Sequence, residues 1–246
     1  MKIIATLILT LWCLAADAQV ISSTWGGNVL VGAGAAAAGL TPPDLMSQDF
    51  EGGASAPSGW SQDTGANVVW NFTPALLGSG SVEAISASGA DWSLGSTLAE
   101  VYVFFYFKPL TIPAGSSEMF HIWNPSGGSY PANEMLRITL QSTGSLLLGC
   151  KGTVNNGGTT SVMTANTLYY VWVHFKFVTS TTSIASVAFS TSLTEPTVGN
   201  NFVSTAAGTA NFGAHDFTFG NGGTSSSINM VYDHIGIATF DMPSGW

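Results

Sequence analysis

Charged residues are scarce in this sequence, and positively charged ones are the scarcest. Lys and Arg together number 5 against 14 Asp and Glu, and charged residues make up 8% of the 246 positions, where about 25% is usual. A nucleic-acid-binding surface needs a basic stripe that releases counterions from phosphates. The formal net charge of −9 argues against that class, so we expect no nucleic-acid partner.

Helical periodicity and cysteine are also lacking. No long stretch beyond the N-terminal run repeats apolar residues at the spacing of an amphipathic helix. The two cysteines are Cys13, which lies in the N-terminal run, and Cys150. We expect Cys150 to be a buried small hydrophobe rather than half of a disulfide. A hydrophobic fraction of 46% excludes disorder, which requires low hydrophobicity.

The N-terminus has the pattern of a secretory signal peptide. Lys2 precedes the apolar run from Ile3 to Ala16, and Ala18 ends a small-residue cleavage motif. The run is shorter than the roughly 20 residues of a membrane-spanning helix. We therefore predict a signal peptide at 1–18 and no membrane span after its removal. The protein would then be secreted, periplasmic or on the cell surface.

Two further regions follow the predicted signal peptide. Residues 19–43 are rich in Gly, Ala and Pro and are interpreted as a linker or N-terminal arm. From 44 to 246 the pattern is strand after strand, with Gly-, Asn- and Ser-rich turns between them. Aromatic, β-branched or alternating segments predict strands at 101–108, 134–141, 146–148, 168–178, 183–190 and 228–240. The fold class predicted is all-β, a single antiparallel two-sheet β-sandwich of the jelly-roll type.

Alternation along these strands separates an apolar face from a face of aromatic, basic and imidazole side chains. If the strands share one sheet, the second faces make one aromatic and cationic surface. Aromatic rings stack on sugars, and basic groups hydrogen-bond hydroxyls or carboxylates. The alternative is a solvated face that shields neighbouring strands. The candidate ligand-binding residues are Tyr106, Lys108, His121, Trp123, Arg137, Gln141, Trp172, His174 and Lys176.

Several segments, in their order along the chain, resemble the concanavalin A-like (laminin G-like) lectin/glucanase superfamily. They are Asp49–Gly52 with Gly59–Trp60, Ser81–Ala84, Val101–Phe107, Leu136–Leu148, Tyr169–Val173 and Val231–Ile237. The resemblance covers about residues 44–246 and implies a jelly roll that serves lectins, hydrolases, lyases and virion attachment proteins alike. It also implies a structural Ca²⁺ held by Glu51 and Asp233. The alternative for these two acids is edge charges and turn caps.

Catalytic motifs are absent. The Glu-x-Asp-x-x-Glu pattern of glycosidases with this fold does not occur. Glu118 and Glu134 fall in phase with the apolar side chains of their strands, or lie at strand starts near a rim. Arg137, His121, His174 and Tyr106 are residue types that a polysaccharide lyase uses, but the short motifs of alginate lyases are missing. We therefore assign no catalytic residue.

Three functions remain open. The preferred hypothesis is an exported, non-catalytic carbohydrate-binding or adhesion domain with a glycan or polysaccharide partner. The second is a structural or attachment protein of a virion or surface assembly, which would associate with itself or with other subunits. The third is a polysaccharide lyase that acts on acidic glycans. Convergence of the candidate residues in one groove would support the glycan-directed hypotheses.

Overall fold

The computed structural model describes residues 41–63, 67–128, 132–150, 153–179, 182–208, 212–220 and 228–245. The signal peptide predicted at 1–18 and most of the predicted arm, residues 19–40, lie outside the described residues. Within the described ranges, no helix is long and apolar enough to cross a membrane.

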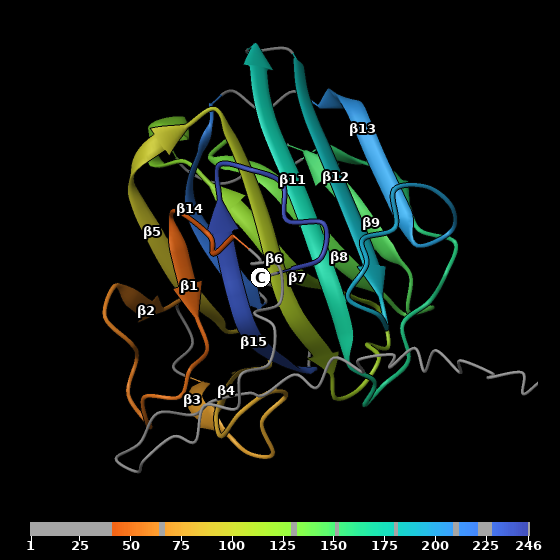
Figure 1. Ribbon diagram of the computed structural model, residues 1–246. Helices are drawn as coiled ribbons and strands as arrows, with labels where there is room; N and C mark the ends of the chain where they lie inside the picture. The colour runs from red at the N-terminus through yellow and green to blue at the C-terminus, as the bar shows by residue number, and fades with distance from the viewer. Residues whose placement is uncertain are drawn as a thin grey trace, which may run out of the picture. The chain divides into compact units, whose positions relative to one another are not determined.

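Two antiparallel sheets make up the described structure (Figure 1). Sheet A has the order β13-β12-β11-β6-β15-β4-β3, and β1 pairs with β15. Its strands are β1 (Met46–Gln48), β3 (Val68–Phe72), β4 (Ser81–Ile85), β6 (Glu100–Pro109), β11 (Tyr169–Thr179), β12 (Thr182–Ser190), β13 (Phe202–Gly208) and β15 (Asn229–Ala238).

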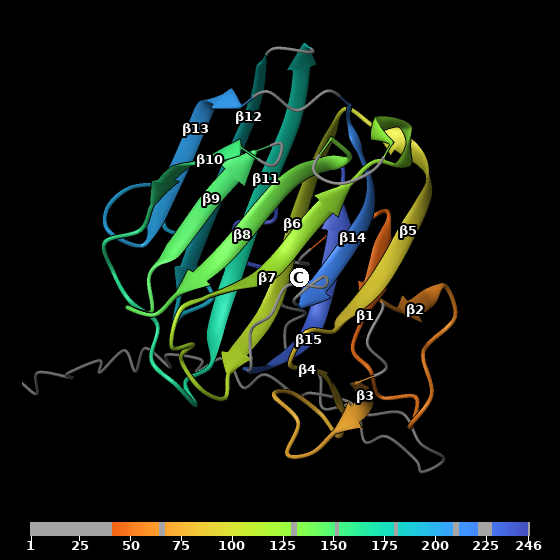
Figure 2. The same ribbon diagram turned by 180° about the vertical axis from the view of Figure 1, so that it is seen from behind.

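Sheet B lies behind sheet A and faces the viewer in Figure 2. Its order is β10-β9-β8-β7-β14-β5-β2. The strands are β2 (Trp60–Gln62), β5 (Gly89–Leu98), β7 (Ser116–Trp123), β8 (Glu134–Gln141), β9 (Leu146–Cys150), β10 (Thr153–Gly158) and β14 (Ala214–Gly220). One 3₁₀ turn, η1 (Pro125–Gly127), follows β7 and is capped by the side chain of Asn124.

The strand predictions are confirmed, and so is the all-β sandwich. The predicted segment 134–141 is β8, and 101–108, 168–178, 183–190 and 228–240 correspond to β6, β11, β12 and β15. The predicted β8–β9 hairpin also forms, with Leu140 opposite Leu146. Gly144 in its turn has a φ of 86°, and a Cβ there would lie 2.3 Å from the Met163 carbonyl oxygen. Only glycine fits both constraints.

The hydrophobic core lies between the two sheets. It is formed by the apolar strand faces that the alternation of side chains predicted. Phe105 of β6 packs on Phe120 of β7 across this space, with ring centroids 5.7 Å apart. Tyr232 is fully buried and donates its hydroxyl to the Met119 carbonyl of the opposite sheet, at 2.7 Å. Cys150 is 1% exposed, as predicted, and burial raises the pKa of its thiol to about 11. Such a thiol is a packing element rather than a nucleophile.

Candidate functional site

The predicted ligand-binding residues do not form one surface, because their strands belong to different sheets. Five of them, Tyr106, Lys108, Trp172, His174 and Lys176, lie on β6 and β11 of sheet A. The other four, His121, Trp123, Arg137 and Gln141, lie on β7 and β8 of sheet B. Each polar face points outward from its own sheet, so the two groups are on opposite sides of the sandwich. The condition of one shared sheet is not met, so Tyr106 and His174 do not converge with His121 and Arg137 in one groove.

On sheet A, the aromatic part of the predicted surface is covered. Tyr106 is 9% exposed and Trp172 only 4%, in a second hydrophobic cluster with Phe104 and Met242. The Trp172 indole N–H donates to the Met242 carbonyl at 3.1 Å. The chain after β15 thus packs over the outer face of this sheet, and these aromatic rings stabilise it there instead of facing a ligand.

His174 and Lys176 of sheet A share one carboxylate. His174 Nε2 lies 2.9 Å from Glu100 Oε1, and Lys176 Nζ lies 2.8 Å from Glu100 Oε2. Tyr102 stacks on His174 with ring centroids 4.4 Å apart. Lys176 is the largest cause that lowers the pKa of Glu100, and His174 adds to it. These partly exposed side chains form a surface ion-pair network. This agrees with the alternative interpretation of the face as a solvated surface rather than a ligand-binding one.

Sheet B carries a tighter polar cluster, which two β-bulges create. The register of β7 with β8 shifts between Glu118 and Phe120, and again opposite Met135. Each bulge inserts one extra residue into its strand. The side chains that precede the bulge therefore point to the opposite face of the sheet from the one that regular alternation would give them. Glu118 and Glu134 therefore leave the apolar phase that alternation assigned to them. Both carboxylates reach the outer face, where His121 and Arg137 lie.

The two carboxylates hold the two basic side chains of this cluster. His121 Nδ1 lies 3.1 Å from Glu134 Oε1, and its Nε2 lies 3.3 Å from Glu118 Oε2. Arg137 Nη1 lies 3.1 Å from Glu118 Oε1, and its Nε lies 3.7 Å from Glu134 Oε1. Burial opposes the charging of His121, but the hydrogen bonds to both glutamates outweigh it and raise its pKa. Each carboxylate of the cluster thus contacts both His121 and Arg137.

Within the described part of the chain, the same cluster is where three side chains that could coordinate a metal ion lie close together. One atom from each of Glu118, His121 and Glu134 lies within 4.8 Å of the others, and all three residues are buried. Arg137 already contacts both carboxylates and supplies positive charge that a metal would otherwise bring.

Next to the cluster, the outer face of sheet B contains a pocket of about 500 Å³. Strand register places Ser61, Asp91, Thr218, His121 and Arg137 in one row across the sheet. The next row begins with Ser93, Asp216 and Trp123. The pocket occupies the β2, β5 and β14 side of these rows, and the buried cluster occupies the β7 and β8 side.

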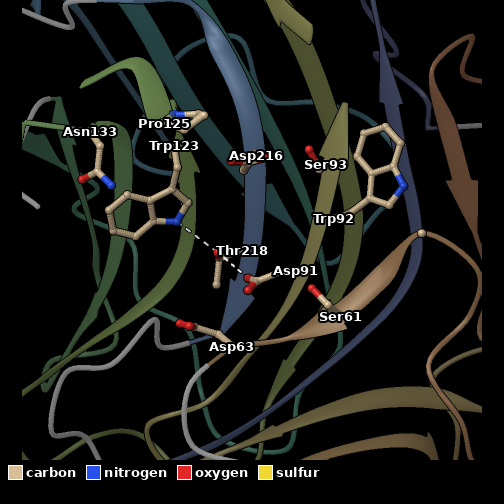
Figure 3. A pocket seen from close by; sticks show the side chains of 11 residues that line it. Ser61, Asp63, Asp91, Trp92, Ser93, Trp123, Pro125, Asn133, Asp216 and Thr218 are labelled. Atoms are coloured by element: carbon tan, nitrogen blue, oxygen red, sulfur yellow. Dashed lines mark hydrogen bonds between the residues drawn. The ribbon is translucent and has the colours of Figure 1, made fainter. Parts of the chain in front are cut away.

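Figure 3 shows how the lining side chains lie. Trp123 and Asn133 stand on one side of the pocket, Trp92 on the other, and Asp91 and Thr218 between them. The Trp123 indole N–H donates to Thr218 Oγ1 at 3.0 Å, and that hydroxyl donates to Asp91 Oδ1 at 2.6 Å. Trp123 also stacks on His121, with ring centroids 4.9 Å apart and planes within 3°. This tryptophan is the physical link between the pocket and the cluster.

Asp91 titrates near neutrality. Burial is the largest cause that raises its pKa to about 7, and the negative charges of Asp63 and Asp216 raise it further. The Thr218 hydrogen bond and the charge of His121 act in the opposite direction. The pocket therefore combines an aromatic wall, hydroxyl groups and three carboxyl groups whose charges act on one another. Such a mixture can bind a polar ligand with an apolar face.

Trp123 is the one residue among those lining this pocket that the sequence had named as a ligand-binding candidate. Asp91, Asp216 and Trp92 are in no motif, and their proximity follows from the pairing of β5 with β14. Gln141 lies at the far end of β8, where its backbone takes part in the hairpin turn, and is not among the lining residues.

The two acids predicted to hold calcium both bind one loop. Both carboxylate oxygens of Glu51 accept the Ser79 backbone N–H, at 2.8 and 2.9 Å. Asp233 Oδ2 accepts the Leu77 N–H at 2.9 Å and the Ser81 hydroxyl at 2.7 Å. Asp233 is 1% exposed, and burial raises its pKa to about 7 despite these hydrogen bonds. Both side chains thus anchor the segment between β3 and β4, and their role as calcium ligands stays a prediction.

The fold defines the class of the protein as a jelly-roll β-sandwich, and comparison with solved structures agrees. The sequence matches no protein-family model and no curated protein. An endo-β-glucuronan lyase from the fungus Trichoderma reesei has a TM-score of 0.55 at 12% identity, over 81% of this chain and 97% of that one. An alginate lyase from Aplysia kurodai has a TM-score of 0.54 at 10% identity, over 80% of this chain and 99% of that one. The receptor-binding domain of botulinum neurotoxin type G has 0.54 at 9%, over 83% of this chain and 50% of that one. At these identities the likeness establishes the fold.

Proposed function

We propose that this protein binds a polysaccharide on the outer face of sheet B. The observation that carries the proposal is the pocket of about 500 Å³, in which the Trp123 ring stands beside hydroxyl and carboxyl groups. Sugar rings offer C–H faces to an aromatic wall and hydroxyls to polar groups. The leader predicted at 1–18 is consistent with export to where polysaccharides occur.

The pocket is preorganised for this task. Trp123 is held from one side by its hydrogen bond to Thr218 and from the other by the His121 ring. His121 is itself fixed between Glu118 and Glu134. Binding therefore costs little side-chain entropy, because the aromatic wall already has its position. On sheet A, by contrast, the aromatic rings are buried beneath the chain after β15.

The proposal is tested by affinity electrophoresis against a panel of neutral, basic and acidic polysaccharides. At least one polymer is expected to retard the protein. Trp123→Ala is expected to weaken that retardation about threefold to tenfold, because an aromatic contact contributes about 0.5–1.5 kcal/mol. Trp172→Phe is the matched control on sheet A and is expected to bind as the parent does. Retardation by no polymer, or equal retardation of the Trp123→Ala variant, contradicts the proposal.

Polysaccharide lyase activity is the second candidate. It is supported by the structural neighbours named as glucuronan and alginate lyases, and by the juxtaposition of His121 and Arg137 on sheet B. Lyase chemistry needs a base at the sugar and a group that neutralises its carboxylate. His121 is 0% exposed and lies between two glutamates, so the cluster would have to open to supply that base. Ultraviolet absorbance of an unsaturated product from glucuronan or alginate, lost in Arg137→Ala, would establish this candidate.

A further inference from the structure

The pocket on sheet B is anionic. Asp63, Asp91 and Asp216 line it, and none of the described lining residues is Lys, Arg or His. The charges of Asp63 and Asp216 both raise the pKa of Asp91, so the three groups share one electrostatic environment. Asp216 also contacts His215, whose Nδ1 lies 2.8 Å from its Oδ1.

The positive groups nearest the pocket already have negative partners. Arg137 and His121 contact Glu118 and Glu134 within the buried cluster. The cluster therefore contributes almost no net charge to the pocket beside it. A ligand that carries carboxylates would meet Asp63 and Asp216 there, and like charges placed together cost binding free energy.

The three aspartates are too widely spaced for one metal ion. Among the described residues, acidic and imidazole atoms from three side chains approach within 4.8 Å of one another at Glu118, His121 and Glu134, not at the pocket aspartates. A single cation, whether a metal ion or one ammonium group, would leave at least one aspartate out of reach. A polymer of amino sugars carries an amine on each ring, so neighbouring ammonium groups can approach different aspartates, and the Trp123 face attracts an ammonium group as well as C–H groups.

We propose that this pocket selects amino sugars with a free amine, so that the bound polymer is a basic polysaccharide of the polyglucosamine kind. This inference rests on the proposed polysaccharide-binding function and names its ligand class. The ammonium groups of neighbouring sugar rings would lie beside Asp63 and Asp216, and a sugar face against Trp123. Glucuronan and alginate, the polymers named for two structural neighbours, carry carboxylates and would be disfavoured here.

The inference is tested by calorimetric titration with three oligosaccharides of equal length: oligoglucosamine, its fully N-acetylated counterpart and oligoglucuronate. The buffer is set at about pH 6, below the pKa of about 7.7 of an α-amino group, so that the amines are protonated. Oligoglucosamine is expected to bind about tenfold tighter than the N-acetylated oligomer, because a charge-assisted hydrogen bond contributes about 1.5–3 kcal/mol. Oligoglucuronate is expected to bind weakest.

Two variants identify the residues responsible. Asp216→Asn and Asp63→Asn are each expected to lose most of the preference for oligoglucosamine while retaining the binding of the N-acetylated oligomer. Asp241→Asn removes one exposed negative charge from the chain after β15 and is expected to keep the preference. This control separates the pocket from the net charge of the protein.

The possible outcomes distinguish the amino-sugar preference from polysaccharide binding itself. Equal binding of the two glucosamine-based oligomers, or tightest binding of oligoglucuronate, would overturn the amino-sugar inference and leave polysaccharide binding intact. Binding of none of the three, together with no retardation by the wider polysaccharide panel, would overturn both.

Discussion

At the residue scale, Glu134 holds the buried cluster of sheet B together. Its side chain is 0% exposed, and its Oε1 lies 3.1 Å from His121 Nδ1 and 3.7 Å from Arg137 Nε. Its Oε2 has no hydrogen-bond partner among the described residues, so the contacts with His121 and Arg137 chiefly compensate the burial of this side chain. Removal of one charge from such a set leaves the others buried without compensation.

Glu134→Gln is therefore expected to lower the free energy of unfolding by about 3 kcal/mol, measured by urea denaturation. The pKa of His121 is expected to fall in the same variant, because one of the hydrogen bonds that raise it is lost. Glu100→Gln is the control, since its ion pairs on sheet A are partly exposed and contribute at most about 1 kcal/mol. Equal destabilisation by the two variants would contradict this account of the cluster.

At the scale of elements, the chain after β15 decides which sheet face is open. Met242 packs on Phe104 and Trp172, and its carbonyl accepts the Trp172 indole N–H. Further along, the Pro243 carbonyl accepts the Glu195 N–H at 2.9 Å. The outer face of sheet A is thus occupied by the protein's own C-terminal segment, and the outer face of sheet B contains the pocket.

Met242→Ala is expected to lower the free energy of unfolding by about 2–5 kcal/mol, because truncation of a buried methionine leaves a cavity. The Trp172 indole proton should then exchange faster with solvent, as measured by NMR. Met163→Ala truncates an equally buried methionine in the core between the sheets. It should destabilise the fold similarly without specifically exposing Trp172. Slow exchange of the Trp172 indole in Met242→Ala would show that the segment does not depend on this contact.

At the scale of the whole molecule, several buried or partly buried acids favour their protonated form. Burial raises the pKa of Asp91, Asp233 and Glu195 to about 7 each, against about 4 in an unfolded chain. Between these values the folded state binds more protons than the unfolded state, so stability falls as pH rises. His121, whose pKa is also raised, acts in the same direction. Glu100 has a lowered pKa, and its stabilisation is lost only in stronger acid.

The melting temperature is therefore expected to be higher at about pH 5 than at about pH 8, measured by calorimetry at constant ionic strength. Asp91→Asn removes one titrating group and is expected to reduce the difference between the two pH values. A higher melting temperature at about pH 8 in the parent protein would show that these acids do not govern its stability.

The sequence by itself determined the elements and the class of fold. Alternation and β-branched or aromatic residues are local properties, and they predicted β6, β8, β11, β12 and β15 close to their observed bounds. The buried state of Cys150 followed from the same local pattern. The scarcity of positive charge likewise predicts, from composition alone, that the protein has no nucleic-acid partner.

Only the tertiary structure decided where the polar side chains meet. Period-two alternation sorts the two faces of a strand but not the sheet to which the strand belongs, so His121 and His174 were predicted together and lie on opposite sides. The bulges at Met119 and Met135 then turn Glu118 and Glu134 outward. A regular period-two pattern does not predict such bulges. Pairing of distant strands brings Asp91, Asp216 and Trp123 around one pocket. Register and sheet membership are non-local, because they depend on the combined packing of all the strands.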